Sequence, residues 1–72
     1  MKQDEIKQLE LYLQKKFALP ALNVRKRPQK SDSVEVNIGD EFIGVIYRDD
    51  DEGEVSYAFQ MAILEIDLDE IG

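Results

Sequence analysis

The side chains that could perform chemistry are few, and carboxylates are the most concentrated of them. Residues 49–54 read Asp-Asp-Asp-Glu-Gly-Glu. Calcium loops place a glycine at the sixth position and a bidentate glutamate at the twelfth. Counted from Asp49, Gly53 comes one position early and Gln60 stands where the glutamate is needed. The run therefore indicates a solvated hairpin tip without a specific metal site, and weak binding of divalent ions by its carboxylates stays open.

Nucleophilic catalysis finds less support than metal binding. Ser31, Ser33 and Ser56 have no histidine in the chain to act as their general base. The sequence also lacks cysteine, so disulfides and thiolate metal sites are excluded, and the lack of histidine excludes imidazole metal sites. We expect no enzyme, no cofactor and no small-molecule substrate.

A single basic cluster offers contacts for phosphate groups. It comprises Arg25, Lys26, Arg27 and Lys30. Aromatic residues that would stack on single-stranded bases are missing around it. The cluster indicates outward charges that protect an edge strand, or partners for the acidic C-terminal half, and nucleic-acid binding is the alternative function.

Charge is unevenly distributed along the 72 residues, whose net charge is −7. Residues 1–30 carry eight Lys or Arg against three acids, and residues 31–72 carry one Arg against thirteen acids. Opposite charges of this kind can neutralise each other within one fold or between two copies. The N-terminus is polar and no apolar run is long enough to cross a bilayer, so we expect a cytoplasmic protein that does not enter a membrane.

The N-terminal segment predicts an amphipathic helix over residues 3–17. Its apolar stripe follows helical spacing and comprises Ile6, Leu9, Leu13 and Phe17. Pro20 ends the helix, and residues 21–27 then read as a first strand with Leu22 and Val24 facing the core.

Two turns predict the register of the remaining strands. A two-residue loop at Gly39 and Asp40 places Val36 opposite Ile43. A three-residue loop before Gly53 places Val45 opposite Phe59. Both turns select the same core face, which on the third strand is Ile43, Val45 and Tyr47.

The expected fold is therefore a single α+β domain of two layers over residues 1–72. The N-terminal helix packs on a four-stranded antiparallel meander (α-β-β-β-β) with strands at about 21–27, 33–38, 41–49 and 54–67. Strand four changes phase near residues 62–64, which predicts a bulge there and an unpaired apolar end. A helix over residues 58–66 is the alternative.

The opposite sheet face and this unpaired end are the candidate protein interface, because nothing in the chain remains to cover them. Scattered surface hydrophobes are the competing interpretation of the face. The candidate residues are Phe42, Gly44, Ile46, Ala58, Gln60, Ala62, Leu64, Ile66 and Leu68.

Residues 39–49 (GDEFIGVIYRD) and 54–68 (EVSYAFQMAILEIDL), with the helix start at Asp4 and the Arg-Lys-Arg-Pro segment, carry a resemblance to a known family. The chain resembles small alphaproteobacterial proteins classed as a domain of unknown function. The resemblance implies a free-standing bacterial cytoplasmic protein and supplies no activity, ligand or site residues.

The function that the sequence favours is a cytoplasmic interaction module. We expect a homo-oligomer or a complex with a protein partner, formed through the exposed sheet face and the C-terminal strand.

Overall fold

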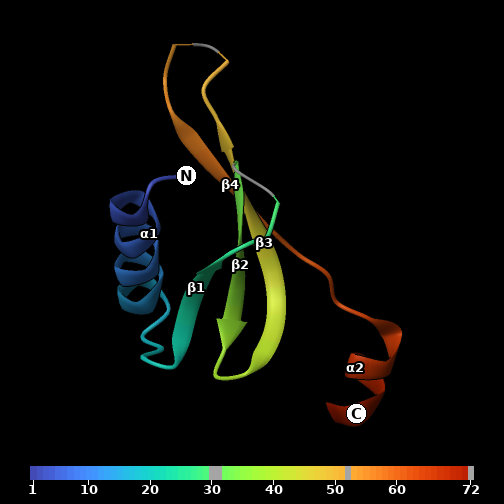
Figure 1. The fold of residues 1–72 in the computed structure, drawn as a ribbon. Coiled ribbons are helices and arrows are strands. Elements are labelled where there is room, and N and C mark those ends of the chain that lie inside the picture. The colour runs from blue at the N-terminus through green and yellow to red at the C-terminus, as the bar shows by residue number, and fades with distance from the viewer. Residues whose placement is uncertain (30–31, 52, 72) are drawn as a thin grey trace.

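The computed structural model describes residues 1–29, 32–51 and 53–71, which form a helix packed on a sheet and a short second helix that lies apart from them (Figure 1). The elements are α1 (Gln3–Lys16), β1 (Leu22–Lys26), β2 (Ser33–Ile38), β3 (Glu41–Asp49), β4 (Ser56–Met61) and α2 (Glu65–Ile71). The strands form an antiparallel sheet in the order β1-β2-β3-β4. The expected α+β meander is confirmed, and α2 is an element that the sequence did not predict.

Helix α1 begins and ends close to the predicted bounds. The backbone N–H of Lys2 donates to Glu5 Oε1 at 3.3 Å, which satisfies a free donor at the helix start. Ile6 and Leu13 of the predicted stripe are buried and Leu9 packs against the core. Phe17 was predicted to join them, but it lies beyond the last helical residue and is exposed.

The core lies between α1 and one face of the sheet, which we call the inner face. Its largest fully buried side chains are Leu22, Val34, Val36 and Ile46. Leu22 and Val24 face inward as predicted. Among the element pairs, α1 packs most closely with β1, so it covers one side of the sheet better than the other.

The predicted register of β3 is wrong by one residue. The turn itself is confirmed, since Ile38 lies opposite Glu41 and Gly39 has a φ of 61°. The register then shifts between Val36 and Asn37, so Val36 lies opposite Gly44 rather than Ile43. Such a bulge reverses the faces of every residue that follows it. Gly44, Ile46 and Arg48 consequently face inward in place of Val45 and Tyr47, whereas Ile43, at the bulge itself, packs against the core as predicted.

The pairing of β3 with β4 also differs from the prediction by one residue, and this difference offsets the one between β2 and β3. Gly53 adopts the predicted left-handed conformation with a φ of 75°. Pairing nevertheless ends at Asp49 and Ser56, which leaves a longer loop than expected and places Ile46 opposite Phe59. Because the two one-residue differences cancel, the inner face of β4 is the predicted one, with Tyr57, Phe59 and Met61.

The C-terminal strand was predicted to run to residue 67, and this is wrong. Strand β4 ends at Met61, and residues 65–71 form α2. The N–H of Leu64 donates to Asp67 Oδ2 at 3.0 Å, and the N–H of Asp67 donates to the Leu64 carbonyl at 2.9 Å. These two bonds close a helical start at the point where the apolar alternation changes phase.

Candidate interaction surface

The outer face of the sheet, opposite α1, carries part of the predicted interface. Phe42, Ala58 and Gln60 lie there and are exposed, Phe42 by 56%. Gly44 and Ile46 were predicted to join them, and this is wrong, since both face inward and Ile46 is 2% exposed. The bulge in β3 causes this reversal.

Val45 and Tyr47 take the places of Gly44 and Ile46 on the outer face. Val45 lies opposite Gln60 and Tyr47 opposite Ala58. Sequence reasoning missed them because a one-residue slip exchanges the two faces. The local signal that might have found them is Gly44, since a strand glycine often marks a bulge or a close backbone approach.

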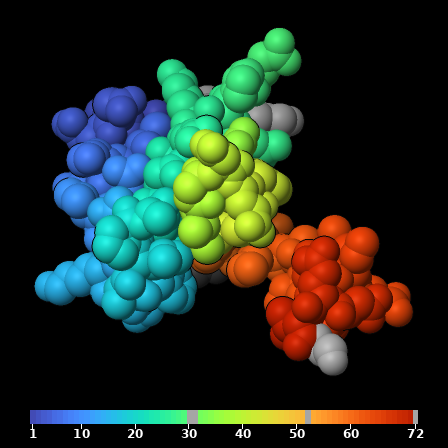
Figure 2. All heavy atoms as spheres, turned by 90° about the horizontal axis from the view of Figure 1, so that it is seen from below, coloured from blue at the N-terminus to red at the C-terminus, as the bar shows by residue number. Residues whose placement is uncertain are grey.

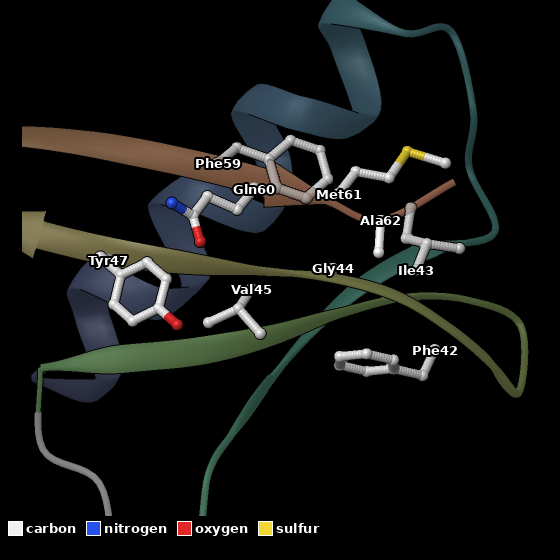
Figure 3. Close-up of a pocket in the computed structure, with 9 residues that line it drawn as sticks. All are labelled: Phe42, Ile43, Gly44, Val45, Tyr47, Phe59, Gln60, Met61 and Ala62. Carbon is white, nitrogen blue, oxygen red and sulfur yellow. The ribbon is translucent and has the colours of Figure 1, made fainter. Parts of the chain in front are cut away.

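A shallow depression surrounds Gly44 at the end of the sheet where β4 stops (Figure 3). Phe42 and Ile43 border it on β3, and Met61 and Ala62 border it where the chain leaves β4. The pairing of β4 with β3 ends at Gly44 and Met61, so the first residues of β3 have no neighbour on this side. The depression is open to both faces.

Gly44 is required by the closeness of β4. A Cβ atom at this position would lie 2.4 Å from the Gln60 carbonyl oxygen and 2.6 Å from Cε1 of Phe59. Real Cβ atoms do not approach neighbours this closely, and the carbonyl is backbone that cannot rotate away. The Phe59 ring therefore lies over a position where only glycine fits.

An apolar groove of about 380 Å³ runs between α1 and the inner face of β4. It exists because α1 sits over the β1 side of the sheet and leaves the β4 side partly open. The apolar and aromatic side chains that line it are Leu9, Tyr12, Leu13, Ile46, Tyr57 and Phe59. No pattern in the sequence indicated the groove, because its two walls come from distant parts of the chain.

A charged cluster closes one end of this groove. The Nε of Arg48 lies 2.9 Å from Glu5 Oε2, and the hydroxyl of Tyr57 donates to the same oxygen. The Tyr57 hydrogen bond, assisted by the Lys2 N–H and the Arg48 charge, holds the pKa of Glu5 below its ordinary value. The same hydrogen bond, together with desolvation and the Glu5 charge, raises the pKa of Tyr57. The cluster ties α1 to β3 and β4 at a single point.

Side chains of α1 seal the free edge of β1. Glu10 Oε2 accepts the N–H of Val24 at 3.0 Å, and Gln14 Nε2 donates to the Leu22 carbonyl at 2.8 Å. These are backbone groups that an added strand would need. Strand addition at β1 is therefore blocked.

The free edge of β4, in contrast, has backbone groups that remain available to an added strand. The Arg48 N–H donates to the Asp32 carbonyl, so the backbone groups of Arg48 and Ile46 point toward β2. Because backbone groups alternate in direction along a strand, those of Val45 and Tyr47 point toward β4. Their partners in β4 are then Ala58 and Gln60, which agrees with the Gln60 carbonyl lying close to Gly44. The alternate residues Tyr57, Phe59 and Met61 point their N–H and C=O groups outward. Within the described residues no hydrogen bond to these outward groups is found.

The C-terminal arm, which we define as residues 62–71, projects away from the body of the molecule (Figure 2). None of the residues of α2 is buried. The predicted interface residues Ala62, Leu64, Ile66 and Leu68 all lie on this arm, as a loop and a helix rather than as a strand. Its large apolar side chains are more than half exposed, up to 85% at Ile71.

The basic segment of the alternative hypothesis is partly occupied by contacts within the chain. Arg25 Nε donates to Asn23 Oδ1 at 2.8 Å, and Arg27 donates to Ser33 Oγ at 3.0 Å. Lys26 is exposed, and Lys30 lies outside the described residues. The two arginines lie on the β1 side of the sheet, away from the apolar groove.

The acidic turn does not gather its carboxylates around one point. Asp49 Oδ1 accepts the N–H of Asp51 at 3.0 Å, and Asp50 lies 3.7 Å from Arg48. Within residues 1–29, 32–51 and 53–71, no group of three or more acidic side chains is arranged to hold a metal ion. The described helices are also too short or too polar to span a membrane.

Comparison with known proteins gives one match. A family model with the description "Protein of unknown function (DUF3126)" matches residues 5–67. Neither a curated protein nor a solved structure matches the chain. The matched residues include the charged cluster, the groove and the open edge of β4.

Proposed function

Because the chain belongs to the DUF3126 family of proteins of unknown function, we propose a role from its surfaces: a small non-catalytic interaction module that associates with a second copy of itself through the free edge of β4. The observation that carries the proposal is the difference between the two sheet edges. Side chains of α1 occupy the backbone groups of β1, whereas the corresponding groups of β4 face outward.

Exposed apolar side chains beside the open edge support the same proposal. Tyr57 and Met61 of β4 and the large apolar residues of the C-terminal arm are all exposed in the single chain. An edge strand with such neighbours pairs readily with another strand. Antiparallel pairing of β4 with its copy gives a closed two-fold dimer with a continuous sheet.

The proposal places this module in the cytoplasm. The absence of cysteine from the sequence fits a reducing compartment. The net charge of −7 favours a soluble protein over one held on anionic lipid.

Met61→Pro tests the open edge. Proline removes the outward N–H of Met61 and leaves the bonds between β3 and β4 intact, since those come from the alternate residues. We expect the dimer of the wild-type chain to weaken by about tenfold or more, because a buried carbonyl left without a donor costs about 1–3 kcal/mol. The measurement is sedimentation equilibrium from micromolar to millimolar concentration.

Met61→Ala is the matched control, since it removes the same side chain and keeps the N–H. Its dimer should be stronger than that of Met61→Pro. A wild-type chain that stays monomeric at millimolar concentration would overturn the proposal, as would equal dimerisation by the proline and alanine variants.

A further inference from the structure

We infer that the C-terminal arm of one copy seats α2 in the apolar groove between α1 and β4 of a second copy, so that the dimer exchanges its arms. This inference rests on the proposed self-association and specifies a second contact within it. It states which segment fills the groove and which surface α2 packs against.

Helix α2 is too short to be stable by itself. It has seven residues, and none of them is buried. Isolated helices shorter than about 12–15 residues are marginal in water, because nucleation is costly and few hydrogen bonds repay it. A helix of this length requires a surface to pack against, and α2 has none within its own chain in this arrangement.

Helix α2 and the residue before it present one apolar side that can pack. Leu64, Leu68 and Ile71 follow each other at intervals of four and three residues, which places them on one face. Ile66 falls on the opposite face. The groove offers apolar walls on both sides, with Leu9 and Tyr12 from α1 and Phe59 from β4.

The uncovered part of the inner face lies on β4. Tyr57 and Met61 of β4 are exposed there, whereas Ile46 of β3 is only 2% exposed and is already covered. An α-helix with its side chains has a diameter of about 10–12 Å, roughly twice the spacing between two strands, so a helix seated in the groove lies over β4 and its free edge.

The direction of the C-terminal arm indicates which copy supplies the helix. Figures 1 and 2 show the arm leaving the end of β4 on the side away from α1, so it points out of its own groove. The open edge of β4 lies on this same side of the sheet. A second copy paired there lies in the direction that the arm takes.

Charge is consistent with the exchange. The arm carries Glu65, Asp67, Asp69 and Glu70 and no basic residue. The Tyr12 wall of the groove carries Lys16, whose ammonium lies 5.7 Å from the Tyr12 ring centroid. Opposite charges at the rim favour the arm over an apolar segment that lacks acids.

Two single substitutions test the contact from its two sides. Leu68→Glu places a charge on the apolar face of α2, and Tyr12→Glu places one in the groove. Both side chains are exposed in the single chain, so the monomer should still fold. We expect each variant to dimerise at least about tenfold more weakly than the wild type in sedimentation equilibrium.

Matched controls exist on the same two helices. Ile66→Glu adds the same charge to the other face of α2, and Leu11→Glu adds it to α1 outside the groove; Ile66 and Leu11 are both exposed. These controls should dimerise like the wild type. Equal weakening by a variant and its control would overturn the inference.

Mixing the two variants distinguishes exchange from folding back. The Leu68→Glu chain keeps an intact groove and the Tyr12→Glu chain keeps an intact arm, so a mixed dimer regains one of its two contacts. We expect association between the differently labelled variants to exceed that of either variant alone. No gain on mixing would mean that each arm binds its own groove, which overturns the exchange.

The outcomes separate this inference from the proposed function. A wild-type dimer that is unchanged by Leu68→Glu and Tyr12→Glu, but weakened by Met61→Pro, would overturn the arm exchange and leave edge pairing supported. A monomeric wild-type chain would overturn both.

Discussion

At the scale of single residues, Glu5 holds the open side of the sheet to α1. Glu10 and Gln14 fasten α1 to β1, whereas Glu5 contacts Arg48 and Tyr57 on the two distant strands. The carboxylate is only 17% exposed, so its charge is screened less than that of a surface ion pair. Sequence reasoning did not single out Glu5, because its partners Arg48 and Tyr57 lie far from it in the sequence.

Glu5→Gln should lower the free energy of unfolding by about 1 kcal/mol at neutral pH. The pKa of Glu5 is lowered from 4.5 in the folded chain, so its contribution is present above pH 4.5 and is lost as the pH falls through the lowered value. The pKa of Tyr57 is raised from 10.0, so its contribution is present below pH 10.0 and is lost as the pH rises through the raised value. Urea unfolding of variant and wild type across this range checks both directions.

The difference in urea midpoint between Glu5→Gln and the wild type should be largest between pH 4.5 and pH 10.0. Asp4→Asn, which changes an exposed carboxylate in the same turn, serves as the control. If the difference in urea midpoint between Glu5→Gln and the wild type stays constant well below pH 4.5, the Glu5 charge does not cause the loss of stability.

At the scale of elements, the bulge in β3 decides which side chains form the core and which form the outer surface. Turn chemistry placed both hairpin turns correctly, since Gly39 and Gly53 have the positive φ values that their turns require. It did not reveal the extra residue near Ile43 or the length of the loop before β4. These two omissions have opposite effects, so β4 was assigned correctly, and β3 was assigned to the wrong face from Gly44 onward, although Ile43 does pack against the core.

Gly44→Ala tests the closeness of β3 and β4. The new Cβ would meet the Gln60 carbonyl and the Phe59 ring, so the strands must move apart. We expect the free energy of unfolding to fall by about 1–3 kcal/mol, the usual cost of overfilling a packed site. Chemical denaturation at a concentration where the chain is monomeric measures it.

Ala58→Ser, an exposed change on β4, is the control and should stay within about 0.5 kcal/mol of the wild type. If Gly44→Ala were equally mild, the close approach of the strands at this point would be refuted.

At the scale of the whole molecule, the single chain has a well-packed half and an unpacked half. Residues of α1, β1 and β2 supply most of the core, and residues 55–71 supply most of the large exposed apolar side chains. A chain of 72 residues hides only about 60% of the surface that its unfolded form exposes, so its margin of stability is small. Association that buries the second half would add directly to that margin.

The stability of the wild-type chain should therefore depend on its concentration. Since folding and dimerisation are linked, each tenfold increase in concentration should add about 0.7 kcal/mol per chain, or about 1.4 kcal/mol per dimer, to the apparent free energy of unfolding once the dimer predominates. Urea midpoints at micromolar and at near-millimolar concentration provide the measurement. Met61→Pro should show a weaker dependence, and a wild-type midpoint that does not move with concentration would contradict self-association.

The sequence by itself determined the elements of the body and their order. Helical spacing identified α1, turn residues placed both hairpins, and alternation identified the inner residues of β1 and β4, because these signals depend on neighbours along the chain. It also indicated an apolar C-terminal end without a partner.

Tertiary structure decided the rest. The bulge brings Gly44 beneath Phe59 and turns Arg48 toward Glu5, and both contacts join residues far apart in the sequence. The groove, the sealed edge of β1 and the open edge of β4 arise from where α1 lies on the sheet. No local pattern encodes that position, since it depends on how the whole set of side chains packs.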